Sequence, residues 1–124
     1  MKQRFFICER CGNIIAMVKD MGRPVMCCGQ KMTEIIPGTT EAAVEKHIPV
    51  WEVKDNKVYV KVGSVPHPMQ PEHYIEWVSI QTKFGNQRKA LKPGDKPEVC
   101  FSVCDNDEVE AVYAYCNIHS LWKA

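Results

Sequence analysis

The sequence lacks several features that would place the protein at a membrane, outside the cell or on nucleic acid. No apolar run approaches the roughly 20 residues that a bilayer-spanning helix requires. The first segment, MKQRFFICERCG, has basic residues but neither a long apolar stretch nor a cleavage site, so it is not a signal peptide. The net charge is only +1, which gives no general attraction to nucleic acid or an anionic membrane. We therefore expect a cytoplasmic protein that binds neither.

Cysteine, in contrast, is abundant, with seven in 124 residues. Disulfides are the simplest explanation, but seven is an odd number, no export signal is present, and cytosolic thiols stay reduced. Metal binding is therefore the favoured interpretation. The length suits one ordinary domain, or a small domain joined to a slightly larger one. The hydrophobic fraction of 45% is enough for a packed core.

The metal-binding residue types are segregated along the chain. Four cysteines lie within the first 28 residues, whereas all four histidines follow residue 46. A Pro-Gly break at Pro37 and Gly38 separates the two parts. We expect a small metal-binding domain at residues 1–36 and a second domain at residues 37–124. A segment as short as the first cannot bury enough core to fold alone, so a metal held by its thiolates is needed as a crosslink.

The predicted fold class is all-β, with short strands around the metal-binding turns of the first domain and an antiparallel β-sandwich in the second. Residues 50–62 have the pattern of a hairpin that turns at Asp55 and Asn56. Turn signals recur about every 8–12 residues, which is typical of a sandwich, and no segment has a convincing helical period. Further strands are predicted at 73–84, ending at Gly85-Asn86, at 98–104, and at 108–116 as the last strand.

The early cysteines, Cys8, Cys11, Cys27 and Cys28, have the spacing of a metal site. In the Cys-x-x-Cys-Gly turn two sulfurs can bind one ion, because the loop amides point inward and Gly permits a tight backbone. A second pair completes a tetrahedral four-sulfur site that suits zinc or iron. Cys27 and Cys28 are adjacent and must splay apart, which should distort the tetrahedron. Spacing alone leaves two roles open: a zinc site that only holds the domain together, or an iron site that passes one electron.

The second candidate site joins the histidines to a late cysteine. A single histidine is more often an ordinary surface or core residue, but His67 lies between two prolines and His73 stands where a predicted strand begins. Five donors exceed the four that zinc prefers. They favour iron with four nitrogens in a plane, an axial sulfur and an open position that attracts and reduces a small anion. The set is His47, His67, His73, Cys116 and His119.

The motifs EKHIP, PHPMQPEHYIEW and CNIHSLW, together with CERCG and the CC pair near the start, closely resemble desulfoferrodoxin, the two-iron superoxide reductase. The resemblance extends over essentially the entire chain. It implies a desulforedoxin-like Fe(Cys)4 domain, followed by an immunoglobulin-like sandwich with an Fe(His)4Cys centre. The implied reaction is one-electron reduction of superoxide to hydrogen peroxide without evolution of O2. The resemblance also implies a homodimer and an electron donor such as rubredoxin or a similar small carrier.

The resemblance further assigns roles to individual residues. Three histidines would bind iron through Nε2 and His119 through Nδ1, with Cys116 as the axial ligand. Glu45 and Lys46 match the pair on the loop over the open position. Glu45 would bind the ferric iron after turnover, and Lys46 would attract superoxide and support protonation.

Two other functions remain open: an electron carrier whose second iron only relays charge, and a zinc-stabilised interaction module. The open iron position argues against the first, and the five-donor set against the second. Cys100 and Cys104 are predicted on one face of a strand, either as a redox pair or, as we favour, as two small, partly buried hydrophobic residues. All three tryptophans are expected in the core or the site wall, and Trp77 could shield the iron.

Overall fold

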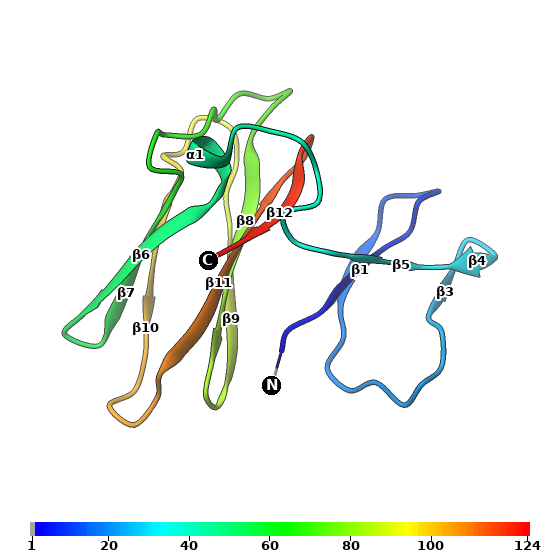
Figure 1. Cartoon of the computed structure of the whole chain (residues 1–124), viewed down its shortest axis with the longest axis horizontal. Helices are drawn as coiled ribbons and strands as arrows, with labels where there is room; N and C mark the ends of the chain where they lie inside the picture. The colour runs from blue at the N-terminus through cyan, green and yellow to red at the C-terminus, as the bar shows by residue number, and fades with distance from the viewer. Residues whose placement is uncertain (1) are drawn as a thin grey trace. The chain divides into compact units, whose positions relative to one another are not determined.

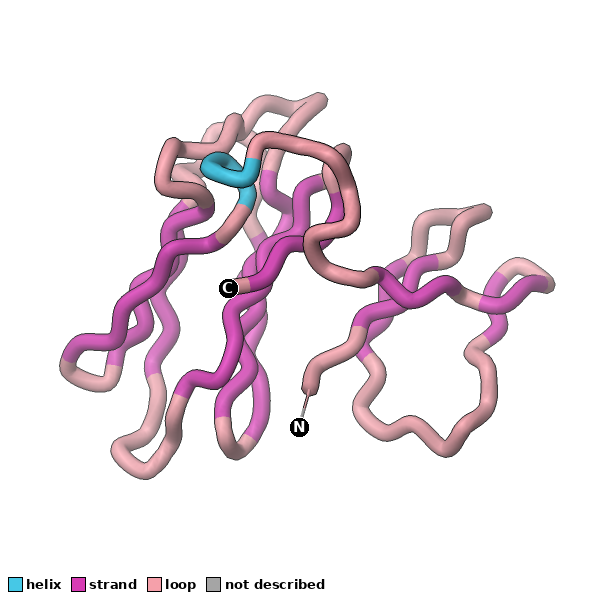
Figure 2. Tube along the Cα trace, viewed as in Figure 1, coloured by secondary structure: helices cyan, strands magenta, loops and turns pink. Residues whose placement is uncertain are grey.

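The computed structural model describes residues 2–124. The chain divides into two compact units between Ile36 and Pro37, and Figures 1 and 2 trace it through both. Strands dominate, and the helix of the described residues is a single turn. The predicted all-β class is therefore confirmed. In residues 2–124 no helix is long and apolar enough to cross a membrane.

The first unit is built on a three-stranded antiparallel sheet. Its central strand is β1 (Phe5–Ile7), which pairs with β2 (Ile14–Ala16) on one side and β5 (Thr33–Ile35) on the other. The short strands β3 (Met26–Cys27) and β4 (Gln30–Lys31) form a separate hairpin.

The buried apolar side chains of this unit are few. In its described part they are Phe5, Cys8, Met32 and Ile35. So small a core leaves little hydrophobic stabilisation to offset the conformational entropy of folding.

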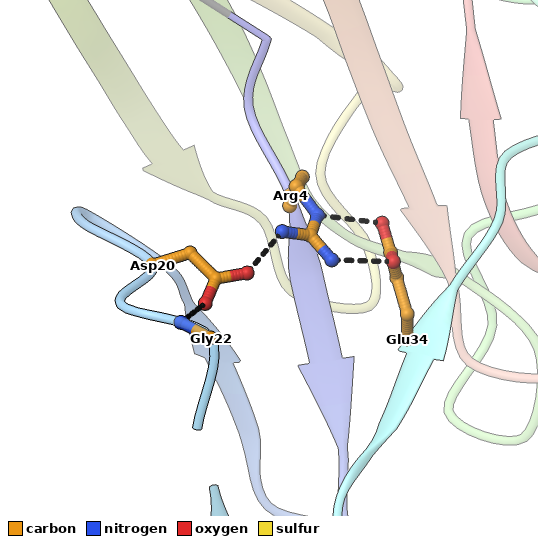
Figure 3. Close-up of polar contacts among 4 residues, drawn as sticks. All are labelled: Arg4, Asp20, Gly22 and Glu34. Atoms are coloured by element: carbon orange, nitrogen blue, oxygen red, sulfur yellow. Dashed lines mark hydrogen bonds and ion pairs between the residues drawn. The ribbon is translucent and has the colours of Figure 1, made fainter. Parts of the chain in front are cut away.

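An ion-pair network around Arg4 fastens the long loop of the first unit to its sheet (Figure 3). The Arg4 guanidinium donates two hydrogen bonds to the Glu34 carboxylate, at 3.0 and 2.9 Å, and one to Asp20 at 2.6 Å. The second oxygen of Asp20 accepts the backbone N–H of Gly22 at 2.7 Å. The guanidinium lowers the pKa of Glu34, and for Asp20 the Gly22 N–H lowers the pKa more strongly than Arg4 does. One side chain thus links β5 to the loop between β2 and β3.

The second unit contains two antiparallel sheets, one ordered β10-β7-β6 and the other β12-β11-β8-β9 (Figures 1 and 2). Its elements are α1 (Val44–His47), β6 (Pro49–Lys54), β7 (Lys57–Val62), β8 (Ile75–Thr82), β9 (Gly85–Ala90), β10 (Glu98–Ser102), β11 (Val109–Cys116) and β12 (Ser120–Lys123).

Both sheets contribute to one hydrophobic core, which defines the sandwich. In β7 burial alternates strictly, with Val58, Val60 and Val62 inward, as a strand with one solvated face requires. Across the core lie residues of β8 and β11, including Ile80 and Val112. Cys116 is a member of this buried cluster and is also one of the predicted metal ligands. The hydrophobic core is therefore continuous with the candidate histidine site.

The predicted turn at Asp55 and Asn56 is confirmed, since both have the left-handed backbone of a tight hairpin (φ 52° and 62°). Two strands of this unit were not predicted. The strand predicted at 73–84 ends at Thr82 and turns into β9, whose six residues are all exposed and show no alternation of apolar side chains. A further strand, β12, follows the predicted last one. The α1 turn before β6 is too short to give a helical period in the sequence.

Candidate metal centres

The four early cysteines converge in the first unit, and we call them the cysteine cluster. Their sulfurs all lie within 4.8 Å of one another. Cys8 and Cys11 stand on a turn closed by the Gly12 N–H to the Cys8 carbonyl at 2.8 Å, and Gly12 has the positive φ (84°) that this turn needs. Cys28 has φ 52°, so left-handed backbone lets the adjacent pair splay.

The donor chemistry of the cysteine cluster fits a metal with four sulfur ligands. Metal–sulfur bonds of about 2.3 Å place two tetrahedral sulfurs about 3.8 Å apart, and the Cys11 and Cys27 sulfurs are 3.6 Å apart. The Cys11 N–H points at the Cys8 sulfur at 3.5 Å, and the Asn13 amide donates to the Cys27 sulfur at 3.8 Å. Such donors stabilise thiolates.

The pKa values of these thiols differ because their side chains lie close together. The Cys11 N–H lowers the pKa of Cys8 to about 6, whereas a hydrogen bond to Cys11 raises the pKa of Cys28 to about 12. One thiolate is therefore favoured and others are held protonated by their neighbours. A cation at the centre reverses this preference, because bound thiols are deprotonated.

The second group of donors, which we call the histidine cluster, is assembled at one end of the sandwich. His47 ends α1, His67 lies in the loop after β7, and His73 precedes β8. Cys116 ends β11, and His119 stands in the turn before β12. The donor atoms of the first three histidines and Cys116 lie within 4.8 Å of one another. His119 joins them through Nδ1, which is 3.1 Å from His47 Nε2 and 3.9 Å from the Cys116 sulfur.

The four imidazole rings are arranged as a square. Neighbouring ring centroids are 4.6 Å apart for His47 and His67, 4.8 Å for His67 and His73, 5.1 Å for His73 and His119, and 4.9 Å for His119 and His47. The His47 and His73 centroids are 6.4 Å apart, so these two rings lie on a diagonal. A tetrahedral arrangement would make all these separations similar.

Nitrogen separations agree with the square. His47 Nε2 is 3.1 Å from both His67 Nε2 and His119 Nδ1. Metal–nitrogen bonds of about 2.1 Å place ligands at right angles about 3.0 Å apart, and tetrahedral ligands about 3.4 Å apart. The spacing is nearer to the right-angled arrangement, which zinc sites with four ligands do not adopt.

Backbone carbonyls orient two of the rings. His47 Nδ1 lies 2.7 Å from the Ala43 carbonyl, and His67 Nδ1 lies 2.7 Å from the Pro68 carbonyl. Each Nδ1 is thereby fixed as the protonated nitrogen, which leaves Nε2 as a lone-pair donor facing the centre. Burial lowers the pKa of both rings, that of His67 to about 4, so both are neutral at pH 7. His73 Nε2 is buried and has no hydrogen-bond partner within residues 2–124, as expected of a nitrogen reserved for a metal.

Cys116 supplies a buried thiol beside the rings. It is 0% exposed, and burial raises the pKa of its thiol. The N–H of His119, 3.4 Å from the sulfur, and that of Ile118 act in the opposite direction. A metal would compensate the burial of a thiolate that the two amides already favour.

The predicted pair Glu45 and Lys46 lies on the exposed α1 turn that ends in His47. The Glu45 carbonyl accepts hydrogen bonds from the Val65 N–H at 2.9 Å and the Ser64 hydroxyl at 3.3 Å. Burial is the main cause of the lowered pKa of His47, and the Lys46 charge adds to it. Lys46 therefore places a positive charge on the turn that ends in His47.

Gly63, directly after β7, allows the α1 turn to pack closely against the backbone there. Its φ is 85°, and a Cβ there would clash first with the Val65 carbonyl oxygen, and would lie 2.7 Å from the Lys46 carbonyl oxygen and 2.8 Å from that of Glu45. Sequence reasoning missed this residue, since only the folded chain brings it against α1.

The tryptophan next to the histidine cluster is Trp122. Its ring centroid lies 4.9 Å from that of His47, and its indole N–H donates to the His119 carbonyl at 2.9 Å. Trp77 instead stacks on Tyr115, with centroids 5.4 Å apart.

Cys100 and Cys104 belong to neither cluster in the described chain. The expected shared strand is wrong, because β10 ends at Ser102. Cys100 is partly buried as expected, but Cys104 is exposed.

The fold and these sites define an all-β protein with two separate groups of metal donors. The family model for desulfoferrodoxin matches residues 39–124. A desulfoferrodoxin homolog from Archaeoglobus fulgidus is 50% identical over 117 residues, or 94% of this chain and 92% of the relative. The chain therefore belongs to the desulfoferrodoxin family.

Solved structures agree with this assignment. The superoxide reductase from Treponema pallidum matches with a TM-score of 0.85 and 41% identity, over 100% of this chain and 99% of that one. The superoxide reductase (1Fe-SOR) from Giardia intestinalis has a TM-score of 0.55 and 33% identity. It is aligned over 95% of its own length but only 64% of this chain.

Proposed function

We propose that this protein is a superoxide reductase, which reduces superoxide by one electron to hydrogen peroxide without evolving O2. The observation that carries the proposal is the square of four imidazoles with a buried thiol beside it. The names of the Treponema and Giardia structures support the same activity. The proposed ligands of the catalytic iron are His47, His67, His73, Cys116 and His119.

Iron is the metal that this donor set favours. Five donors with a right-angled nitrogen spacing suit a metal that tolerates square-pyramidal geometry, and zinc prefers four. When bound, ferrous iron would supply the electron that, with two protons, converts superoxide to hydrogen peroxide.

The chain prepares the site for that chemistry. The carbonyls of Ala43 and Pro68 hold two rings in the tautomer that presents Nε2, so little rearrangement is needed on metal binding. Cys116 would provide the negative charge that donates electron density once a metal offsets its burial, and the amide N–H groups at its sulfur favour the thiolate. The surrounding core excludes water from the thiol side.

Lys46 and Glu45 are the proposed catalytic residues outside the ligand set. Lys46 carries a positive charge on the exposed turn beside the rings, where it can attract an anion and deliver protons through water. Glu45, one residue earlier, offers a carboxylate that can bind the ferric iron after turnover.

For the first unit we propose an Fe(Cys)4 centre in a desulforedoxin-like domain at residues 1–36, with the reductase domain at residues 37–124. Sulfur spacing supports a four-sulfur site, and the desulfoferrodoxin relatives support iron over zinc. The ligands would be Cys8, Cys11, Cys27 and Cys28.

The partners and location remain proposals drawn from the family. Superoxide is the substrate, rubredoxin or a similar small carrier is the electron donor, and the chain is a cytoplasmic homodimer.

Pulse radiolysis of the iron-loaded protein tests the function. We expect one hydrogen peroxide per superoxide consumed and no O2. Release of O2 would indicate dismutation, and no reaction would leave the electron-carrier alternative.

Lys46→Ala tests the capture of an anion in the same experiment. Because a cleft of one sign raises on-rates by roughly 10–1000-fold in total, we expect loss of one lysine to slow the bimolecular step by about tenfold. The dependence on ionic strength should weaken while iron content stays unchanged. Lys57→Ala, at the far end of β7 from the histidine loop, is the matched control.

A further inference from the structure

Asn117 fastens together the two segments that carry three ligands of the histidine cluster. It lies between Cys116 and His119, in the turn after β11. Its side-chain oxygen accepts the backbone N–H of Tyr74 at 3.0 Å, and its side-chain NH2 donates to the carbonyl of Glu72 at 3.1 Å. Its own backbone N–H donates to the Tyr74 carbonyl at 3.2 Å. These three bonds flank His73 on both sides.

His73 is the ligand that most needs such support. The rings of His47 and His67 each have a backbone carbonyl against Nδ1, and the indole of Trp122 holds the backbone of His119. No comparable orienting bond to the His73 ring is present among residues 2–124. Its ring position therefore depends on its backbone, which a short bridge to Gln70 and the Asn117 contacts hold.

A primary amide is well suited to this contact. It offers an acceptor and a donor in one plane, so it can satisfy an N–H and a C=O on either side of a single residue. Aspartate has nearly the same shape but would place a carboxylate oxygen against the Glu72 carbonyl, and alanine would leave both groups unpaired.

We propose that Asn117 is a positioning residue, which sets the place of His73 relative to Cys116 and His119. It touches neither substrate nor metal and acts only through the backbone on either side of His73. The inference rests on the proposed function only in taking His73 as an iron ligand.

The test is a double-mutant cycle on iron release to a chelator in the full-length, iron-loaded protein. Replacing groups that orient metal ligands typically lowers metal affinity by about 10–100-fold. We therefore expect Asn117→Ala to accelerate release from the histidine cluster by about tenfold or more, and Asn117→Asp by less, since Asp keeps the Tyr74 bond. The thiolate-to-iron absorption band should shift while iron is still bound. Asn86→Ala, in exposed strand β9, is the matched control and should change neither quantity.

The cycle separates positioning from a general structural role. In a His73→Ala background, Asn117→Ala should have no further effect on iron release, because its target is gone. An equal acceleration of iron release in both backgrounds would overturn the proposal, because it would show that Asn117 only stabilises the turn after β11. If Asn117→Ala does not fold, Asn117→Asp, which keeps the size, decides in the same two backgrounds. Superoxide is absent from these measurements, so failure of the proposed reaction would not be mistaken for failure of this inference.

Discussion

The cysteine cluster and the histidine cluster differ in how the chain encloses them. In the cysteine cluster Cys8 is buried but Cys11 and Cys28 are exposed, and the described part of the unit around them has only a few buried apolar side chains. In the histidine cluster Cys116 is 0% exposed, His47 2% and His67 3%, and the other two rings are partly buried. A metal bound to the cysteine cluster would therefore have to supply much of the stability of the first unit, whereas the sandwich core of the second unit can hold its donors in place without one.

The donor sets also differ in charge. Four thiolates outweigh the charge of a ferrous ion, which suits storage or transfer of an electron. One thiolate and four neutral imidazoles leave a ferrous ion with net positive charge, which suits the capture of an anion. The comparison predicts that the two units can be disrupted separately.

The largest expected effect on the second unit comes from Cys116→Ser. A serine hydroxyl is a poor iron donor at neutral pH and gives no sulfur charge-transfer band. We expect that band and nearly all peroxide production to disappear, while the absorption of the cysteine cluster persists. Absorption spectra and pulse radiolysis measure both, and Cys104→Ser, at an exposed thiol outside both clusters, is the control. Normal turnover by Cys116→Ser would remove the thiolate from the mechanism.

Metal removal should affect the two units unequally. After chelation under reducing conditions, we expect residues 2–36 to lose their structure, because a metal bound to the cysteine cluster is their main crosslink. Residues 37–124 should keep a dispersed amide spectrum, because their core is independent of metal. Two-dimensional NMR before and after chelation tests this. Simultaneous collapse of both units would contradict the distinction.

Gly63→Ala should disturb the second unit without touching a ligand. The new Cβ would clash with the carbonyl oxygen of Val65 and with those of Glu45 and Lys46 in the α1 turn, at a backbone with φ 85°. We therefore expect a loss of more than about 1 kcal/mol of stability and a slower reaction with superoxide. Gly94→Ala has a similar φ (92°) but open space, and Gly85→Ala has open space without positive φ. Equal effects on the reaction at Gly63 and Gly94 would show that strain alone, and not the position of α1, is responsible.

The smallest effect is expected from Arg4→Gln in the first unit. Exposed ion pairs contribute little and are screened by salt, so the cysteine cluster should keep its metal. The loop that Arg4 holds through Asp20 should loosen, and hydrogen exchange at the Gly22 amide should accelerate a few-fold at low salt and less at high salt. Arg88→Gln, in β9, is the control. Unchanged exchange would mean that the metal alone orders this loop.

The sequence predicted the two donor groups because each donor stands in a distinctive local setting. A Cys-x-x-Cys-Gly turn and histidines beside prolines can be recognised before anything is known of the fold. The sandwich was predicted from short strands with turn signals about every 8–12 residues, and the alternating burial of β7 agrees with it.

The structural features that could not be predicted from the sequence depend on backbone atoms and on contacts between distant segments. β9 contains no large apolar residue, so only its pairing with β8 identifies it as a strand. The carbonyls of Ala43 and Pro68 orient rings through atoms that every residue possesses. Gly63 and Asn117 act on segments about 20 and 40 positions away in the chain, a relation that no local motif encodes.

The separation of the ligands along the chain has a consequence for the order of assembly. The cysteine cluster spans residues 8–28, whereas the contact between His47 and His119 joins residues 72 positions apart. Closing a short loop costs less entropy and takes less time than bringing distant strands together. We therefore expect that the first site can capture a metal while most of the chain is still unfolded, which leaves it little means of selecting among thiophilic ions. The second site should form only after the sandwich has closed, so it would meet the available metals with its geometry already set.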